Sequence, residues 1–501
     1  MDILISIAQV NVKIGDFNQI FKQVAKNIEI AKKQNADIIV FPELIVSGYF
    51  SSDYLQKSSF IGEVEEVLQK IKLLSNDIAI IIGAPTKDTY TKKLRNSALC
   101  FYNQSLIHIT HKSLIPNYDI FDESRYFEPA TSIEVVEFKG YRIAITIGED
   151  LCDVNNNQFE YNIKVADELV KQKPSLIINI ASSPFDYLKE SEINDRLIKN
   201  AQKYNLPIVY VNAVGAQGEL IFDGGSKFIN AQGQIVSQLP FFEEVQQTIS
   251  LSSVNAKQAE EYLFQTDSEK IYNALVLGIK DYFKKSNFKT AIIGLSGGID
   301  SALVVSLATV ALGKDNVFCI YMPMQYSSDS SNKDAKTLAE NLGVNFEIIS
   351  IENTFVHFLN LLSPHMGKLP IDTTEENIQA RIRGLILMAY SNKFGHILLN
   401  TSNKSEIACG YGTLYGDMCG ALAVIGDVYK TQVYDLCRFI NKDIEIIPNN
   451  ILIKEPSAEL RLHQKDTDSL PPYSVLDAIL FQYIEMNQDI QTISQNLSVD
   501  V

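Results

Sequence analysis

Six consecutive residues, Ser296 to Ser301, combine two serines, two glycines and an aspartate in a pattern suited to holding phosphate. An apolar run precedes them and another follows at helical spacing, which predicts a strand, a glycine-rich turn and a helix. Such a turn directs backbone N–H groups and hydroxyls at one point beside the positive end of a helix, as a pyrophosphate cradle does. Asp300 suits a Mg²⁺ ion that bridges phosphate oxygens. A phosphate loop that ends in Gly-Lys-Ser/Thr is missing, which disfavours γ-phosphate transfer; the structural alternative is a turn that holds no ligand.

The elements that would position this turn form the second half of an α/β chain. Residues 1–240 alternate short apolar runs with amphipathic segments, which predicts a layered α/β domain. From residue 268 a helix leads into strands that alternate with helices, which predicts a doubly wound parallel sheet with a nucleotide at the carboxyl ends of its strands. We therefore expect a first domain over 1–245, a connector over 246–267 and a second domain over 268–501.

The composition describes ordinary globular protein, with 46% hydrophobic and 21% charged residues. A net charge of −16 over 501 residues argues against a nucleic-acid partner, which would require a basic surface. No apolar run approaches the roughly 20 residues of a membrane span, and the N-terminus shows no targeting leader. The six cysteines are scattered without a Cys-x-x-Cys pair, which indicates reduced thiols and a cytoplasmic location.

The Ser-Gly-Gly-x-Asp-Ser turn resembles the motif of the ATP pyrophosphatase family, whose members cleave ATP between the α and β phosphates. With three further segments, the chain from about residue 268 onward resembles the NAD synthetases of that family. The segments are Glu375 to Gly384 (Glu-Glu-Asn-Ile-Gln-Ala-Arg-Ile-Arg-Gly), Thr401 to Glu406 (Thr-Ser-Asn-Lys-Ser-Glu) and Gly426 to Thr431 (Gly-Asp-Val-Tyr-Lys-Thr), with Glu455 to Leu460 (Glu-Pro-Ser-Ala-Glu-Leu) after them.

This resemblance implies a ligase that forms a C–N bond. The carboxylate of nicotinic acid adenine dinucleotide attacks the α-phosphorus of ATP, and ammonia then displaces AMP from the acyl adenylate. Both steps place negative charge on phosphate oxygens, so positioned donors and Mg²⁺ carry most of the catalysis. Matching the motifs makes Asp300 and Glu406 the Mg²⁺ ligands and places Asn377 and Glu406 beside the dinucleotide; the structural alternative for Glu406 and Lys430 is a solvated surface charge. The implied ATP-binding residues are Gly294, Leu295, Ser296, Gly297, Gly298, Ile299, Asp300, Ser301, Thr401 and Lys430.

Four segments of the first 240 residues resemble the nitrilase, or carbon–nitrogen hydrolase, family, in particular the glutaminase domain fused to bacterial NAD synthetases. The segments are Phe41 to Leu44, His111 to Phe127, Gly148 to Leu151 and Ala181 to Phe185. The resemblance implies an α-β-β-α sandwich in which a Cys-Glu-Lys triad hydrolyses glutamine and ammonia passes to the synthetase site. A thiolate attacks the amide carbon, the glutamate moves the proton and the lysine stabilises the oxyanion. By this match Glu43 is the base and Lys112 the lysine, while Tyr118, Ser183 and Lys189 fall at the glutamine contacts.

The nucleophile of that triad is missing. Where the family pattern reads Cys-Glu-Asp, this chain reads Gly148-Glu149-Asp150, and the nearest thiol is Cys152, four positions later. A displacement of about 1 Å at a reacting atom can cost about 100-fold in rate, so Cys152 is better explained as a structural thiol. Three interpretations of Gly148 stay open: a natural domain without glutaminase activity that leaves an ammonia-dependent enzyme, an engineered substitution, or Cys152 serving as the nucleophile after all.

Other functions remain for comparison. Enzymes with the same loop also catalyse tRNA thiolation, GMP formation and asparagine formation. The acidic net charge of this chain disfavours tRNA as a substrate. A different class is a glutamine-binding regulatory or scaffold protein built on an inactive nitrilase domain. We expect nicotinic acid adenine dinucleotide, ATP and glutamine or ammonia as partners, without nucleic acid or membrane, and a homo-oligomer, because relatives form dimers. Two-domain relatives commonly continue with a basic tail, whereas this sequence ends at Val501, which leaves open how the dinucleotide is held.

Overall fold

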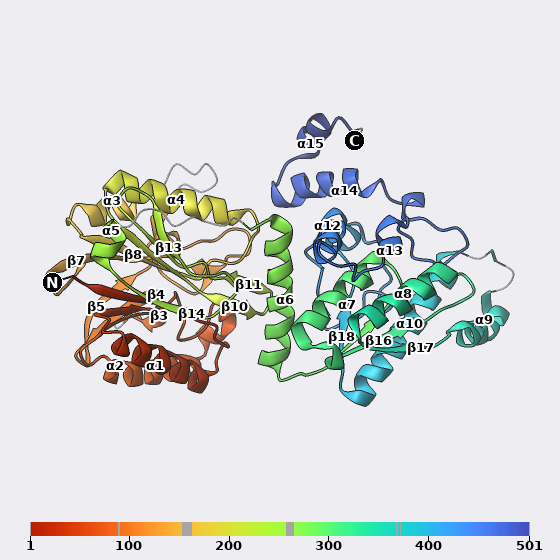
Figure 1. Cartoon of the computed structure of the whole chain (residues 1–501), viewed down its shortest axis with the longest axis horizontal. Helices are drawn as coiled ribbons and strands as arrows, with labels where there is room; N and C mark the ends of the chain where they lie inside the picture. The colour runs from red at the N-terminus through yellow and green to blue at the C-terminus, as the bar shows by residue number, and fades with distance from the viewer. Residues whose placement is uncertain are drawn as a thin grey trace. The chain divides into compact units, whose positions relative to one another are not determined.

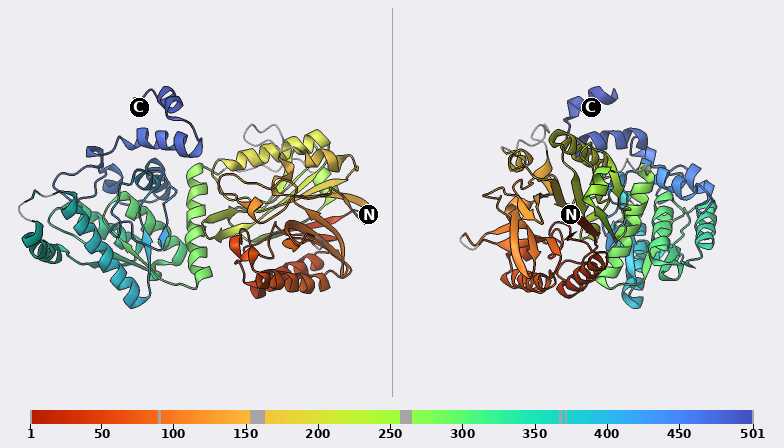
Figure 2. Two further views of the ribbon diagram at one scale, coloured as in Figure 1. Left: turned by 180° about the vertical axis from the view of Figure 1, so that it is seen from behind. Right: turned by 60° about the vertical axis from the view of Figure 1, so that its left-hand side comes forward.

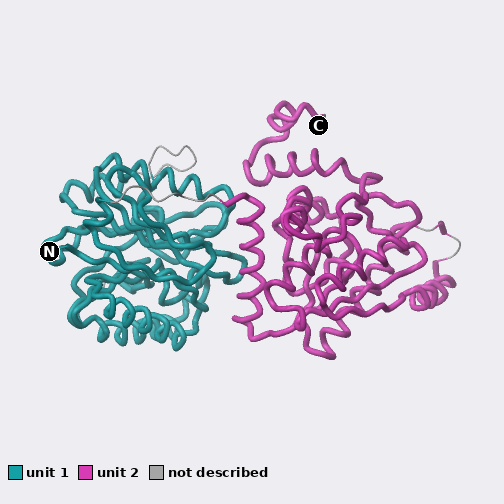
Figure 3. Tube along the Cα trace, in the orientation of Figure 1, with its two compact units in different colours: residues 1–264 teal, residues 265–501 magenta. Residues whose placement is uncertain are grey.

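The chain divides into two compact units, Met1–Phe264 and Gln265–Val501 (Figure 3). The computed structural model describes residues 2–88, 91–152, 163–256, 265–366, 369–370 and 372–499. Among these residues, no helix is both long enough and apolar enough to cross a membrane.

The first unit contains two six-stranded mixed sheets and a short hairpin. The first sheet contains, in spatial order, β14 (Val245–Ser250), β1 (Leu4–Gln9), β2 (Ile38–Val40), β3 (Ala79–Lys87), β4 (Leu94–Tyr102) and β5 (Ser105–His111). The second contains β13 (Ile235–Gln238), β12 (Lys227–Ile229), β9 (Ile208–Asn212), β8 (Leu176–Ala181), β7 (Tyr141–Ile147) and β6 (Val136–Phe138). The hairpin pairs β10 (Val214–Gln217) with β11 (Leu220–Asp223).

The two sheets pack face to face and helices cover their outer faces, as expected for an α-β-β-α sandwich. One apolar cluster, which includes Ile5 and Ile145, joins strands of both sheets and forms the layer between them. A second cluster packs α1 (Phe17–Lys33) and α2 (Ser58–Leu73) on the first sheet, and a third packs α3 (Val165–Val170) and α4 (Lys189–Tyr204) on the second. Figures 1 and 2 show this layering from opposite sides. Because both faces of the central strands are covered, strands such as β8 are buried throughout and mostly apolar.

Part of the expected connector belongs to the first unit. Strand β14 pairs antiparallel with β1 in a register from Leu4 opposite Ser250 to Gln9 opposite Val245, and α5 (Leu251–Ala256) follows it. The sequence did not predict β14 as a strand, because it lies at the edge of the sheet, where its residues are half-buried and several of them are polar. Residues 257–264 of the expected connector lie outside the described residues.

The second unit is built on a five-stranded parallel sheet, as expected for a doubly wound fold. Its spatial order is β17 (Asn345–Ile348), β16 (Val317–Tyr321), β15 (Ala291–Gly294), β18 (Ile397–Asn400) and β19 (Leu422–Ala423). Helix α7 (Ile299–Leu312) follows β15 directly and is buried along most of its length. The other helices are α6 (Asp267–Ser286), α8 (Asp329–Leu342), α9 (Glu352–Met366), α10 (Thr373–Phe394), α11 (Lys404–Cys409), α12 (Lys430–Ile440), α13 (Asn449–Ile453), α14 (Tyr473–Leu480) and α15 (Ile490–Leu497).

Candidate active sites

The glycine-rich turn of the second unit joins β15 to α7 and is fixed by its own hydroxyls. Ser301 Oγ accepts from the Ser296 N–H at 3.2 Å and donates to the Gly298 carbonyl at 3.0 Å. Gly298 is the N-cap of α7, so the turn lies at the positive end of a 14-residue helix. Gly297 adopts a φ of +80°, and a Cβ there would lie 2.4 Å from the Ser331 carbonyl oxygen. Only glycine allows this close approach.

The turn lines a cavity of about 270 Å³ at the carboxyl ends of β15, β16 and β18. This is where an open parallel sheet binds its ligands. The cavity is lined by every residue for which the sequence implies an ATP contact, namely Gly294, Leu295, Ser296, Gly297, Gly298, Ile299, Asp300, Ser301, Thr401 and Lys430. Glu406 also lines it. Asn377 does not; it accepts a hydrogen bond from Thr413 Oγ1 at 2.7 Å.

Asp300, Glu406 and Lys430 converge in this cavity. Lys430 Nζ lies 2.5 Å from Asp300 Oδ2 and 3.6 Å from Glu406 Oε1, and Asn403 Nδ2 donates to the other Asp300 oxygen at 2.9 Å. Asn403 also forms a reciprocal capping box with Glu406 at the start of α11. Burial and the nearby Asp300 charge raise the pKa of Glu406 to about 8. Lys430 is almost completely buried, which excludes the solvated-surface interpretation for this lysine.

The chemistry of these two carboxylates is compatible with a Mg²⁺ ion. A cationic group already lies between them, so they converge on a point that favours positive charge. Mg²⁺ is commonly bound by one or two carboxylates together with phosphate oxygens and waters. The described residues contain no group of three or more metal-ligating side chains, so the phosphates would have to supply further ligands.

In the first unit, Glu43, Lys112 and Gly148 meet near the ends of β2, β5 and β7. Lys112 Nζ donates to Glu43 Oε1 at 2.8 Å, and both side chains are 2% exposed. A Cβ on Gly148 would lie 3.1 Å from Glu43 Oε2 and 3.2 Å from Lys112 Nζ. The position that the family pattern assigns to the nucleophile therefore adjoins both Glu43 and Lys112, but it carries no side chain.

Three further side chains that the sequence did not single out complete this network. Glu123 Oε1 accepts from Lys112 Nζ and from Tyr49 Oη, both at 2.8 Å, and Asn96 Nδ2 donates to Glu43 Oε1 at 2.7 Å. Burial alone would lower the pKa of Lys112, but the charges of Glu123 and Glu43 raise it above its usual value. The lysine is therefore held as an ammonium. Glu123 lies in the His111 to Phe127 segment, but nothing in its spacing indicated that its side chain would reach Lys112.

Asp150 fixes the backbone on both sides of this site. Its Oδ1 accepts from the N–H groups of Ser113 and Leu114, both at 2.9 Å, and its Oδ2 accepts from that of Ile147 at 3.1 Å. Burial raises the pKa of Asp150 to about 7. The side chain thus ties the turn at Gly148 to the segment that follows Lys112.

The expected glutamine contacts are divided between the cavity and its edge. A cavity of about 40 Å³ is lined by Glu43, Lys112 and Gly148 and, of the three expected glutamine contacts, by Ser183. The other two, Tyr118 and Lys189, do not line it. Both pack against the ring of Phe121: the Tyr118 and Phe121 ring centroids are 5.3 Å apart, and the Lys189 ammonium lies 5.9 Å from the Phe121 centroid. Phe121 itself lines the cavity.

Cys152 does not line this cavity. Its thiol lies 2.8 Å from Glu149 Oε2 and 2.6 Å from Arg196 Nη1. Burial raises the pKa of Cys152 to about 12, so the sulfur is a neutral thiol near pH 7. The geometry matches a structural thiol rather than a nucleophile.

Comparison with known proteins covers both units. The carbon–nitrogen hydrolase family model matches residues 4–259, and the NAD synthase family model matches residues 271–501. The glutamine-dependent NAD(+) synthetase of Synechocystis sp. is 43% identical, over 98% of this chain and 90% of its own. That of Thermotoga maritima is 37% identical, over 98% of this chain and 90% of its own.

Solved structures agree with these matches. A glutamine-dependent NAD+ synthetase from Acinetobacter baumannii, solved with ADP, superimposes with a TM-score of 0.86 at 35% identity and covers all of this chain and 91% of its own. The glutamine-dependent NAD(+) synthetase of Cytophaga hutchinsonii shares the fold, with a TM-score of 0.84 at 21% identity, over 99% of this chain and 88% of its own. This chain belongs to the glutamine-dependent NAD(+) synthetase family.

Proposed function

We propose that this protein is an NAD⁺ synthase, which amidates nicotinic acid adenine dinucleotide at the expense of ATP and releases AMP and pyrophosphate. The observation that carries this proposal is the 270 Å³ cavity, in which the Ser296–Ser301 turn, the Asp300–Glu406 carboxylates and the buried Lys430 come together. This combination suits cleavage of ATP at the α-phosphorus rather than transfer of its γ-phosphate. The family membership supports nicotinic acid adenine dinucleotide as the source of the acceptor carboxylate.

The residues of the cavity divide the chemistry among them. Backbone N–H groups and hydroxyls of the turn bind the phosphates at the start of α7. When the substrate carboxylate attacks, the bond between the α-phosphorus and the bridging oxygen breaks, and its electron pair stays on pyrophosphate. Lys430 lies where it can neutralise the charge that accumulates on the phosphate oxygens. Ammonia then attacks the acyl carbon, and AMP leaves.

Asp300 and Glu406 would hold Mg²⁺ in this cavity. The ion would supply a Lewis acid that polarises the phosphate oxygens. Lys430 contacts both carboxylates, and its ammonium would contribute positive charge to the same cavity.

Free ammonia is the nitrogen source that the geometry supports best. A covalent glutaminase needs a nucleophile at residue 148, where Glu43 and Lys112 meet, and glycine provides none. Glutamine as the source is the alternative, because the buried network of Glu43, Lys112 and Glu123 is complete. That alternative would require Cys152, which does not line the cavity and whose thiol contacts Glu149 and Arg196.

We further infer a homo-oligomer and a cytoplasmic location. Large apolar side chains of α9 and α10 are exposed, among them Leu361 at 63%, Leu385 at 63% and Phe394 at 60%; a second copy of the chain would cover such a surface. Sedimentation velocity of the wild-type protein and of Leu385→Lys tests this contact.

The cytoplasmic location rests on the cysteines. All six cysteines are free, which agrees with a reducing compartment.

The test is NAD⁺ formation from nicotinic acid adenine dinucleotide, ATP and Mg²⁺, with ammonium and glutamine supplied separately. We expect turnover with ammonium and none with glutamine above an ammonium-free blank. Equal turnover with glutamine would disprove the assignment of the nitrogen source. Pyrophosphate release with another acceptor, but not with this dinucleotide, would disprove the assignment of the substrate.

A further inference from the structure

Lys454 and Glu459 form an ion pair inside the nucleotide cavity that the roles assigned above leave unexplained. Lys454 Nζ lies 2.7 Å from Glu459 Oε1, and the two side chains are 24% and 19% exposed. Both residues line the cavity together with the Ser296–Ser301 turn. Glu459 belongs to the Glu-Pro-Ser-Ala-Glu-Leu motif, which directly follows Lys454 and for which the sequence indicated no separate role.

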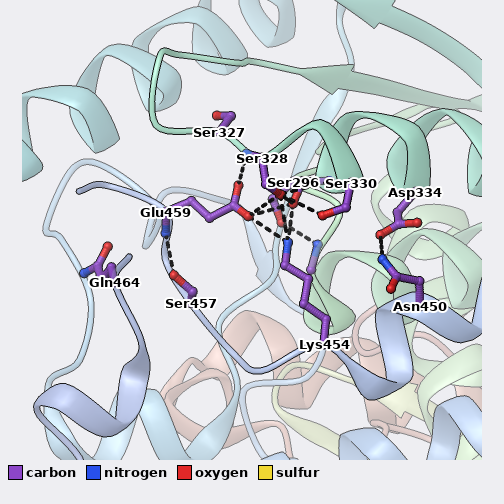
Figure 4. A network of polar contacts seen from close by, with 12 residues as sticks. Ser296, Ser327, Ser328, Ser330, Asp334, Asn450, Lys454, Ser457, Glu459 and Gln464 are labelled. Carbon is purple, nitrogen blue, oxygen red and sulfur yellow. Dashed lines mark hydrogen bonds and ion pairs between the residues drawn. The ribbon is translucent and has the colours of Figure 1, made fainter. Parts of the chain in front are cut away.

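Two serines at the start of α8 hold this pair in place (Figure 4). Glu459 Oε1 accepts from Ser331 Oγ at 2.7 Å and from Ser328 Oγ at 3.0 Å, and Lys454 Nζ also donates to Ser331 Oγ. Ser328 is the N-cap of α8. Glu459 therefore fixes the ammonium of Lys454 beside the first turn of that helix.

The same serine places this ammonium close to the phosphate cradle. Gly297 approaches the backbone of Ser331 so closely that a Cβ would lie 2.4 Å from its carbonyl oxygen. Asp300, in the same turn, binds Lys430 at 2.5 Å. The turn thus contacts one lysine through Asp300 and is linked to a second lysine through Ser331.

A purely structural contact explains this arrangement less well. An ammonium has three N–H donors, and here two go to Glu459 and Ser331, while the contact to Ser328 Oγ is 3.5 Å long and hence weak. The side chain is partly open to the cavity instead of being sealed. One donor is therefore available to a ligand without loss of the two contacts that hold the lysine.

We propose that Lys454 is a further catalytic residue, which binds the β- and γ-phosphates of ATP and stabilises the departing pyrophosphate, and that Glu459 is its positioning residue. As the carboxylate oxygen bonds to the α-phosphorus, the bond from that phosphorus to the bridging oxygen breaks, and its electron pair passes to pyrophosphate. Lys454 stabilises that charge by a hydrogen bond and transfers no proton. This inference rests on the proposed function only in requiring that ATP be cleaved at the α-phosphorus.

Lys454→Met tests the proposal by calorimetric titration with Mg²⁺ pyrophosphate and, separately, with AMP. A lost charge-assisted hydrogen bond is worth roughly 10- to 100-fold in affinity. We expect that loss for pyrophosphate, with unchanged binding of AMP, a lower kcat for pyrophosphate release and partial recovery in Lys454→Arg. The matched control is Lys465→Met, because that half-exposed lysine of the same segment pairs with Glu455; this variant should behave as wild type.

Two results would overturn the inference. Unchanged affinity of Lys454→Met for pyrophosphate would show that the lysine does not touch that part of the nucleotide. Equal weakening of pyrophosphate and AMP would show that the pair only supports the cavity wall. Neither measurement depends on the acceptor, so a protein that binds pyrophosphate through Lys454 but forms no NAD⁺ would refute the proposed function and leave this inference standing.

Discussion

Lys112 and Glu43 form an ion pair of 2.8 Å between side chains that are each 2% exposed. Glu123 accepts from the same ammonium at 2.8 Å and is equally buried. Ionised groups without access to water are tolerated only when each has partners. The network is consequently part of the core of the first unit, whatever chemistry takes place there.

Lys112→Met should therefore destabilise the first unit strongly. The substitution leaves two buried carboxylates without their cation, which costs about 3–5 kcal/mol in comparable sites. Urea unfolding followed by a probe in the first unit measures the loss. Lys93→Met, which removes an exposed partner of Glu128, should change the free energy of unfolding by less than about 1 kcal/mol. A similar small change for Lys112→Met would mean that the network carries no stability.

Gly148→Cys should create glutaminase activity. The new Cβ lies 3.1 Å from Glu43 Oε2 and 3.2 Å from Lys112 Nζ, so these groups must yield by a few tenths of an ångström to admit it. The φ of +48° adds about 1–2 kcal/mol of backbone strain for a non-glycine residue. We expect ammonia release from glutamine and covalent labelling of residue 148 by an electrophilic glutamine analogue.

Two further variants test how that activity arises. Gly148→Cys combined with Glu43→Gln should lose it again, because no base then accepts the thiol proton. Cys152→Ser should leave ammonium-dependent NAD⁺ formation unchanged. If Cys152→Ser instead abolished a glutamine-dependent reaction of the natural chain, Cys152 would be the nucleophile and the match at residue 148 would be wrong.

Glu406→Gln should impair NAD⁺ formation more than it impairs folding. A carboxamide has no charge for the metal, so kcat should fall by about 100-fold and the Mg²⁺ concentration for half-maximal rate should rise. Steady-state rates over a series of Mg²⁺ concentrations measure both. Glu485→Gln is the control, because that residue contacts Lys404 rather than Lys430. An unchanged Mg²⁺ dependence in Glu406→Gln would exclude it as a ligand.

Lys227 should make the stability of the first unit rise with pH in the alkaline range. Burial lowers its pKa from 10.5 to about 8, and its ammonium donates to Asn194 Oδ1 at 2.5 Å. Between pH 8 and 10.5 the unfolded state then binds more protons than the folded state, so the free energy of unfolding gains about 3 kcal/mol across that range. Below pH 8 the lysine is protonated in both the folded and the unfolded state, so it adds no pH dependence to the free energy of unfolding there.

Lys227→Met isolates this effect from other groups that titrate at alkaline pH. The difference in unfolding free energy between wild type and variant should change with pH only between about 8 and 10.5, in favour of the wild type as pH rises. A pH-independent difference would show that the lysine keeps its ordinary pKa.

Local patterns in the sequence predict most of the longer strands and helices of the first unit but miss the short strands β6 and β10 to β13. Apolar spacing predicts a strand over residues 4–8 and a helix over 18–34, where the structure has β1 at Leu4–Gln9 and α1 at Phe17–Lys33. It misses β14, because an edge strand with half-buried polar residues has no apolar signature. The pairing of β14 with β1 joins residues almost 250 positions apart, which no local pattern encodes.

The candidate sites show the same division. Residues of contiguous motifs, such as the Ser296–Ser301 turn, come together in one cavity because a strand, a turn and a helix suffice to arrange them. The sequence assigned no role to Glu123 or Lys454, because each depends on a partner elsewhere in the chain. Glu123 pairs with Lys112, and Lys454 contacts Ser331. Asn377 was expected beside the substrate, but its amide faces Thr413, and its role stays a prediction.

The empty place at Gly148 has a genetic consequence. The codons GGU and GGC for glycine become the cysteine codons UGU and UGC by one base change. Lys112, Glu43 and Glu123 stabilise one another in the core. Selection for folding alone would therefore preserve these three charges while the thiol is absent. Where codon 148 is GGU or GGC, one point mutation would therefore supply the thiol that this site lacks.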